Sequence, residues 1–182
     1  MIGVSWAALF LHHGVHVQAW DPDPEARDAL VDRVKALMAQ LRQLGAGADR
    51  PGRLTVHGGL TEVFSGAFFV QENAPERLDV KHDLYRRFEL HAAADALIAS
   101  SASGLPWSRL SAQMDRPERL LNAHPYNPPH LVPLVELFCP AEASLARAED
   151  LYRRIGRVPV RMKREEVGHW ANRRASALWR EA

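Results

Sequence analysis

Short apolar segments alternate with amphipathic segments of helical period along the chain, and this alternation restricts the fold more than any other feature. Consecutive parallel strands need a crossover long enough to hold a helix, so the pattern predicts an α/β fold with a mostly parallel sheet and helices on both faces. The expected strands are 15–20, 54–57, 67–71, 96–100, 120–123, 134–138 and 158–162.

Helical periodicity marks the segments between these strands. The clearest runs from Leu30 to Leu44, where apolar residues recur every three or four positions. Asp23 and Pro24 predict where this long helix starts, because Pro is favoured at the first helical position. The other expected helices are 4–13 closed by Gly14, 78–88 with Val80, Leu84 and Phe88 on one face, 145–155 closed by Gly156, and one beginning at 168.

Composition excludes several classes of protein. The chain has 182 residues, enough to bury a core, and a formal charge of +1 with no basic run, which gives no support to nucleic acid or membrane-surface binding. Its single cysteine, Cys139, excludes an internal disulfide and a cysteine metal site, and we expect it to be buried and inert. No apolar stretch is long enough to span a bilayer, and no signal peptide is expected, so the cytoplasm is the default location.

A histidine and a carboxylate flank a proline-rich loop near the middle of the chain. Glu136 lies inside the apolar run 134–138, where a buried carboxylate is costly without a partner, and His124 at the other end of the loop is the nearest candidate. A histidine oriented by a glutamate can act as a general acid or base. The alternative is a loop histidine and a strand-edge glutamate that never meet.

Polar residues stand where several of the expected strands end. Ligands of parallel sheets bind at the carboxyl ends of the strands, which makes these residues candidates for a functional site. They are Asp21, Glu72, Ser101, Ser103 and His124. Four further histidines, His12, His13, His130 and His169, have no spacing typical of a metal site, and we expect loop and surface positions for them.

Asp21 and Gly3 carry a partial nucleotide-binding pattern. Asp21 ends a strand and lies eighteen positions after Gly3, which precedes a helix. Gly3 could be the last glycine of a Gly-x-Gly-x-x-Gly turn, and Asp21 the acid that binds the ribose 2′-OH. A glycine before a helix and an aspartate in a turn are also common without any nucleotide.

Five blocks of sequence occur in the order and spacing of one enzyme family. The chain resembles the NAD-binding domain of the 3-hydroxyacyl-CoA dehydrogenase family, and within it the branch that acts on small hydroxy acids such as carnitine or gulonate without CoA. The blocks are Trp6–Leu11, Gln71–Arg77, Ala99–Leu105, His124–Glu136 and Gly168–Arg173. The resemblance implies a Rossmann-like domain over 1–166 and the start of a helical C-terminal domain over 167–182.

The resemblance also implies roles for individual residues. It makes His124 the catalytic base and Glu136 its carboxylate partner, with Ser103 and Asn172 near the reacting oxygen and the histidine. It implies NAD as cofactor, held by Gly3, Asp21, Glu76, Lys81, Ser101 and Ser103. From the residues alone, Glu76 and Lys81 could instead be a solvated pair at a helix start, and Ser103 and Asn172 could be capping or packing residues.

The activity implied is NAD-dependent oxidation of the 3-hydroxyl of a small hydroxy acid to a ketone, with no metal and with a homodimer for the full-length relative. The alternatives are a 3-hydroxyacyl-CoA dehydrogenase proper and a non-catalytic crystallin-like or remnant nucleotide-binding protein. The family's first strand, its first two phosphate-loop glycines and most of its C-terminal domain have no counterpart here. We therefore expect a sheet lacking its first strand, and a fragment truncated at both ends that is weak or inactive alone.

Overall fold

The computed structural model describes residues 2–45 and 47–165. The helix expected from Gly168 onward, with Asn172 on it, lies outside the described residues. In chain order the elements are α1 (Ile2–His12), β1 (Val17–Ala19), α2 (Pro24–Asp28), α3 (Leu30–Leu44), β2 (Leu54–Val56), η1 (Leu60–Phe64), β3 (Phe69–Glu72), α4 (Leu78–His91), β4 (Leu97–Ser100), α5 (Trp107–Leu110), η2 (Pro117–Arg119), β5 (Leu120–Pro125), β6 (Leu134–Phe138), α6 (Glu142–Arg154) and β7 (Val158–Arg161).

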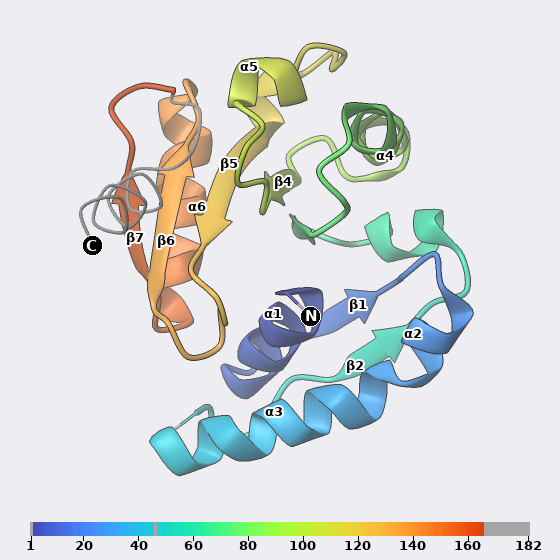
Figure 1. The fold of residues 1–182 in the computed structure, drawn as a ribbon, viewed down its shortest axis with the longest axis vertical. Coiled ribbons are helices and arrows are strands. Elements are labelled where there is room, and N and C mark those ends of the chain that lie inside the picture. The colour runs from blue at the N-terminus through green and yellow to red at the C-terminus, as the bar shows by residue number, and fades with distance from the viewer. Residues whose placement is uncertain (1, 46, 166–182) are drawn as a thin grey trace, which may run out of the picture.

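The strands of the described residues form two sheets, which Figure 1 shows with helices around them. β1 pairs with β2, and the larger sheet has the order β3-β4-β5-β6-β7. Every pair is parallel except β5 and β6, so the prediction of a mostly parallel sheet is confirmed. Within the described residues no strand pairing joins β1 to β3.

The long helix predicted after Pro24 is two helices. Asp23 caps α2 as expected, since its side chain accepts a hydrogen bond from the backbone N–H of Glu25 at 3.0 Å. Ala29 (φ −78°, ψ −11°) then separates α2 from α3. The prediction of one continuous helix was wrong, because the spacing of apolar residues cannot reveal a break of a single residue. Gly14 follows α1 with a φ of +82°, a left-handed conformation that suits glycine at a helix end.

Two hydrophobic cores lie on opposite faces of the larger sheet. One packs α1, α3 and α6 against residues such as Ala99, Leu121 and Val135. The other packs η1, α4 and α5 against the opposite face, with Ile98 and Leu120 contributed by the strands. Because side chains alternate along a strand, neighbouring residues of β4 and β5 enter different cores. The prediction of helices on both faces is therefore confirmed.

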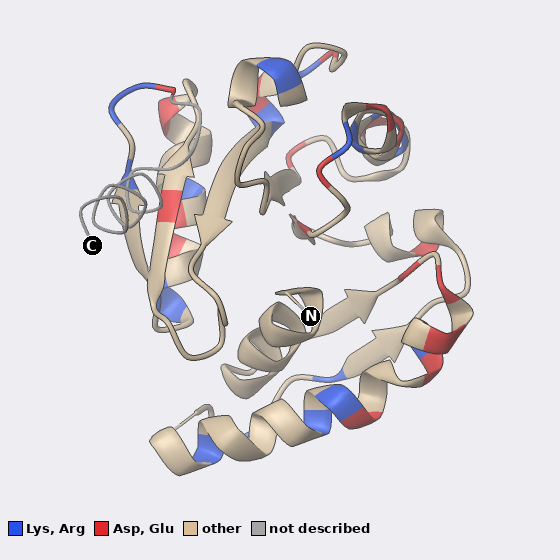
Figure 2. Ribbon diagram, viewed as in Figure 1, with Lys and Arg blue, Asp and Glu red and all other residues tan. Residues whose placement is uncertain are grey.

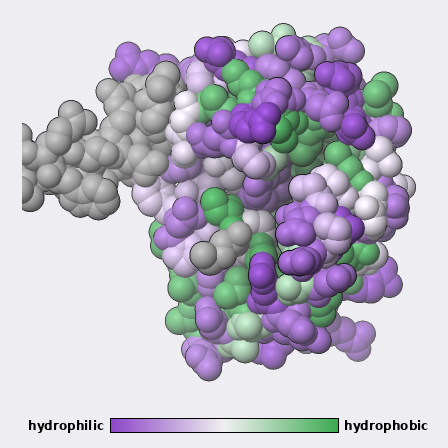
Figure 3. Space-filling view, turned by 45° about the vertical axis from the view of Figure 1, so that its right-hand side comes forward, coloured by the Kyte–Doolittle hydropathy of each residue, from purple (hydrophilic) through white to green (hydrophobic). Residues whose placement is uncertain are grey.

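Charged residues lie mainly on the helices and loops, and both signs are interspersed (Figure 2). On the face in Figure 3, apolar residues are mixed with hydrophilic ones. None of the helices among residues 2–45 and 47–165 is long and apolar enough to cross a membrane.

Candidate active site

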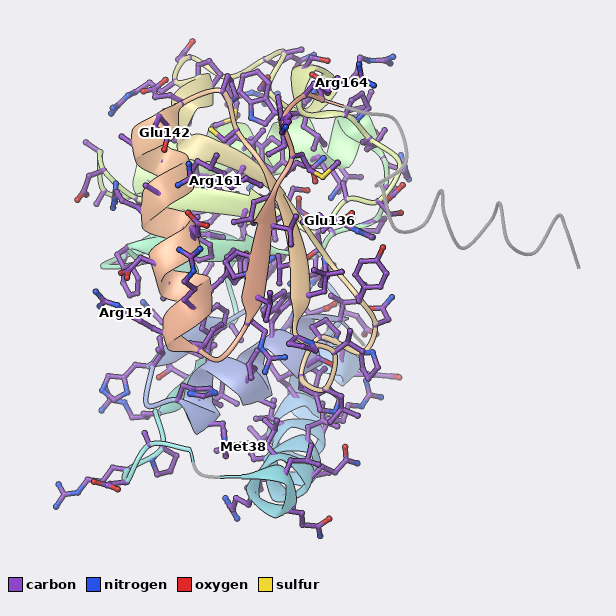
Figure 4. All side chains as sticks on the ribbon, turned by 90° about the vertical axis from the view of Figure 1, so that its left-hand side faces the viewer. Met38, Glu136, Glu142, Arg154, Arg161 and Arg164 are labelled. Carbon is purple, nitrogen blue, oxygen red and sulfur yellow. The ribbon has the colours of Figure 1, made fainter. Side chains whose placement is uncertain are left out.

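His124 and Glu136 are brought together by strand register. They are directly opposite each other in the antiparallel pair of β5 and β6, and opposed residues point to the same face of a sheet. His124 Nδ1 lies 3.1 Å from Glu136 Oε2, and the two side chains are only 8% and 2% exposed. In Figure 4, Glu136 is labelled beside β6, on the side of the strands away from α6. The expected pairing is present in the structure, and its catalytic role stays a prediction.

The pairing selects one form of the neutral His124 ring. An ionised carboxylate only accepts hydrogen bonds, so the proton facing Glu136 is on Nδ1 and the lone pair is on Nε2. The ring also packs edge-on against Tyr126, with centroids 5.6 Å apart. A histidine held in this way can take a proton at Nε2, and the carboxylate then stabilises the positive charge on the ring.

Ser103 is held by Glu76. The Ser103 hydroxyl donates to Glu76 Oε1 at 2.6 Å, the backbone N–H of Gly104 donates to the same oxygen at 3.1 Å, and the backbone N–H of Ser103 also donates to it. Burial alone would raise the pKa of Glu76, but these hydrogen bonds outweigh it and hold the pKa below its usual value. Ser103, predicted to be catalytic, is thus hydrogen-bonded directly to Glu76, predicted to bind the cofactor.

Ser101 lies in a second link between the loops after β3 and β4. Its hydroxyl donates to Asn73 Oδ1 at 2.8 Å and accepts from Gln71 Nε2 at 3.1 Å. The backbone N–H of Ser101 also donates to Glu72 O at 3.0 Å. The two loops that carry Glu76 and Ser103 are therefore fixed to each other at several points.

Lys81 is buried, with 1% of its side chain exposed. Its ammonium donates to both oxygens of Glu72, at 2.6 and 2.8 Å, and to Ala74 O at 3.1 Å. The hydroxyls of Tyr85 and Ser100 each donate to Glu72 Oε2 at 2.7 Å. The alternative of a solvated pair with Glu76 was wrong, because Glu72 is buried at the end of β3 and pairs with the Lys81 ammonium there.

Asp21 and Gly3 lie where a nucleotide can bind, Asp21 just after the end of β1 and Gly3 in the first turn of α1. Asp21 follows the carboxyl end of β1 and is exposed, with Oδ1 accepting from the N–H of Asp23 at 3.0 Å. Gly3 lies in the first turn of α1, whose early N–H groups have no partner within the helix. A Cβ at Gly3 would stand 3.4 Å from Asn73 Nδ2, an ordinary contact, so helix packing alone does not require glycine there. An acceptor for ribose hydroxyls and a helix N-terminus for a pyrophosphate fit the chemistry of NAD.

The structure adds Asn122 to the candidates. It precedes His124 by two residues on β5 and therefore shares its face of the sheet. Its Nδ2 donates to Leu105 O at 3.1 Å, which ties the loop after Ser103 to the strand of His124. The alternation of β5 was the signal in the sequence that could have found it.

The expectation of surface positions was wrong for His12 and His130, which are 8% and 5% exposed. His130 is buried because Ser5 and Gln40 offer it hydrogen-bond partners on two helices. Among residues 2–45 and 47–165 no group of His, Cys, Asp and Glu could hold a metal ion. Cys139 is buried as expected, and burial raises the pKa of its thiol.

Comparison with known families and proteins gives one consistent result. Residues 1–165 match the family model described as 3-hydroxyacyl-CoA dehydrogenase, NAD binding domain. An L-carnitine dehydrogenase of Streptomyces griseus is 44% identical over the whole of this chain and 56% of its own length. One from Pseudomonas aeruginosa is 43% identical over the whole of this chain and 58% of its own length. The chain thus spans a little over half the length of these curated relatives.

A solved structure shows the same fold. The crystal structure of 5-formyl-3-hydroxy-2-methylpyridine 4-carboxylic acid 5-dehydrogenase, described as an NAD⁺-dependent dismutase, superposes with a TM-score of 0.85 at 32% identity. The match covers 99% of this chain and 60% of that one. A diketoreductase structure, 26% identical, gives a TM-score of 0.86 over 97% of this chain and 65% of its own.

Proposed function

Because the chain belongs to the 3-hydroxyacyl-CoA dehydrogenase family and carries its NAD-binding domain, we propose that it serves the NAD-dependent oxidation of a small 3-hydroxy acid to a ketone. The substrate we propose is L-carnitine, since the relatives that are 44% and 43% identical bear the name L-carnitine dehydrogenase. The observation that carries the proposal is the buried pair of His124 and Glu136, next to Asn122, which ties the loop after Ser103 to the same strand.

In this proposal His124 Nε2 takes the proton of the substrate 3-hydroxyl. Glu136 keeps the ring in the required form and stabilises the imidazolium that results. When bound, NAD would accept the hydride that leaves the carbon bearing this hydroxyl. Ser103 is proposed to lie close to the reacting oxygen. Its hydroxyl donates a hydrogen bond to Glu76, which fixes its orientation. Asn172, the other residue proposed near this oxygen, lies outside the described residues.

Six residues are proposed to hold NAD: Gly3, Asp21, Glu76, Lys81, Ser101 and Ser103. Asp21 would accept from the ribose hydroxyls, and the first turn of α1 at Gly3 would face the pyrophosphate. The contacts of Lys81 support an indirect role in cofactor binding. Its ammonium fixes Glu72 and the loop that leads to Glu76. Ser101 fixes the neighbouring loop through Asn73.

The wider assembly is also proposed from the relatives. Residues 167–182 would begin a second, helical domain, and the complete protein would be a homodimer. The homodimer and the cytoplasmic location stay predictions.

The test measures NAD binding by calorimetry and NADH formation from L-carnitine by a protein that contains this chain. His124→Asn should lower kcat by roughly 10²–10⁴-fold, the usual worth of a positioned base, and leave NAD affinity unchanged. His91→Asn, at the exposed end of α4, is the matched control and should change neither quantity. NAD binding without NADH formation from any 3-hydroxy acid or 3-hydroxyacyl-CoA would support the non-catalytic alternative instead. Full activity of His124→Asn would overturn the proposal.

A further inference from the structure

His130 connects the loop of the candidate base to the first turn of α1. The loop of residues 126–133 joins His124 to Glu136, and His130 is buried in it at 5% exposure. Its Nδ1 lies 3.1 Å from the hydroxyl oxygen of Ser5, which is 125 residues away in the sequence. Ser5 is itself buried, at 3% exposure, and lies two residues after Gly3. A single side chain therefore spans the two parts of the site proposed for the reaction and for the cofactor.

The hydrogen bonds of His130 have a defined direction. Its Nε2 lies 3.2 Å from Gln40 Oε1, and a carbonyl oxygen only accepts, so the ring proton is on Nε2. Nδ1 then carries the lone pair and accepts the hydroxyl proton of Ser5. Burial, together with the nearby charge of Arg157, lowers the pKa of His130 and keeps this neutral form.

Arg157 holds the same loop from another side. Its guanidinium donates to Pro129 O at 2.9 Å and to Val132 O at 3.2 Å. With its backbone fixed there, the loop has few ways to respond locally to a displacement of His130. A shift of Ser5 is then transmitted along the loop toward the two strands that it joins, and with them toward His124 and Glu136.

We propose that His130 is a positioning residue that couples occupation of the pyrophosphate site at the N-terminus of α1 to the position of the His124 ring. The inference rests on the proposed function, because it takes α1 as the helix that faces the pyrophosphate. A ligand at the first turn fixes Ser5, Ser5 fixes His130, and the loop presents His124 to the substrate only when the cofactor is in place. Such coupling is reciprocal, so a fixed loop also strengthens cofactor binding.

ADP-ribose is the probe, since it carries the pyrophosphate and both riboses of NAD but lacks the nicotinamide ring that would itself disturb His124. The signals of the imidazole nitrogens in the chain are recorded by NMR with and without saturating ADP-ribose, and His124 is assigned by the loss of its signals in His124→Gln. The native chain should show a shift of the His124 signals on binding. Ser5→Ala and His130→Phe should bind ADP-ribose several-fold more weakly and show no such shift at saturation.

Gln40→Met is the matched control. It removes the other hydrogen bond of His130 but leaves the link to Ser5, so the His124 shift should persist. A merely structural role of His130 would instead make Gln40→Met and Ser5→Ala behave alike. If His130→Phe fails to fold, Ser5→Ala, which deletes one oxygen atom, carries the test.

The outcomes separate this inference from the proposed function. If the protein that contains this chain binds neither NAD nor ADP-ribose, the proposed function fails and the coupling fails with it. If it binds both, and the His124 shift is the same in native, Ser5→Ala and His130→Phe chains, only the coupling is overturned.

Discussion

The Ser103 hydroxyl donates a hydrogen bond to Glu76 Oε1 at 2.6 Å, and the two residues lie in loops that follow different strands. Glu76 follows β3 and Ser103 follows β4, and parallel strands bring their carboxyl ends to one edge of the sheet. The contact fixes which way the serine hydroxyl points. Because its proton is directed at Glu76, the Ser103 hydroxyl can still accept a hydrogen bond from a bound ligand without giving up the bond that positions it.

Glu136→Gln should slow the reaction less than loss of His124. The glutamine oxygen can still accept the Nδ1 proton of His124, but it has no charge to stabilise the imidazolium. The difference between a charged and a neutral hydrogen bond is about 1–1.5 kcal/mol, so kcat should fall by about tenfold. Glu142→Gln, whose side chain is 75% exposed on α6, is the control. A kcat of Glu136→Gln equal to that of the native protein would show that the carboxylate does not assist His124.

NAD should bind more tightly than NADP. A 2′-phosphate at Asp21 would meet a carboxylate, whereas a free 2′-OH can donate to it. Arg27 lies on α2 and donates to Asp21 O at 2.6 Å, so Asp21→Ser should leave a guanidinium close to the 2′ position. We expect this variant to gain about tenfold or more in NADP affinity, or about 1.4 kcal/mol. Calorimetric titration of both proteins with both cofactors checks it, and tighter NADP binding by the native chain would contradict the assignment of Asp21.

Lys81→Met should be strongly destabilising. It would leave the carboxylate of Glu72 buried without its counter-charge, and breaking a buried pair in this way costs about 3–5 kcal/mol. Lys35→Met is the matched control, because the Lys35 side chain is 72% exposed in its pair with Asp32 and such pairs contribute about 1 kcal/mol or less. Urea unfolding of the three proteins measures the difference. Equal midpoints for Lys81→Met and Lys35→Met would show that the buried pair adds no stability.

The sequence pattern predicted the strands well and the packing of α4 poorly. The alternation of apolar and helical segments located every strand of the described residues, because each strand is a short, largely apolar run between segments of helical period or turn residues. On α4 the expected face was Val80, Leu84 and Phe88, whereas the buried residues are Lys81, Tyr85 and Phe88. A periodicity of apolar residues always assigns a lysine to the solvent-facing side of a helix. Lys81 is buried instead because its ammonium pairs with the buried carboxylate of Glu72.

The candidate site shows the same limit. The pairing of His124 with Glu136 could be anticipated because a buried carboxylate needs a partner, although its cause is cross-strand register and not only the prolines of the loop. The contact of His130 with Ser5 could not be anticipated, since it joins residues 125 positions apart through the packing of a loop on a helix. Local patterns specify which residues are polar inside a strand, and tertiary packing decides what they meet.

The hold of Glu76 on the Ser103 loop should persist in mild acid and be lost only below the ordinary pKa of a glutamate, 4.5. A carboxylate whose folded pKa is depressed favours the folded arrangement fully above its unfolded pKa, and this contribution disappears as the pH falls through the folded value. The backbone N–H signals of Ser103 and Gly104, followed by NMR, should therefore titrate together with a midpoint below 4.5. Glu76→Gln should abolish this transition, because an amide does not ionise. Glu62→Gln, which alters a different glutamate that accepts from the N–H of Gly59, should leave it unchanged. A midpoint at or above 4.5 would mean that the hydrogen bonds from Ser103 and Gly104 do not outweigh the burial of the carboxylate.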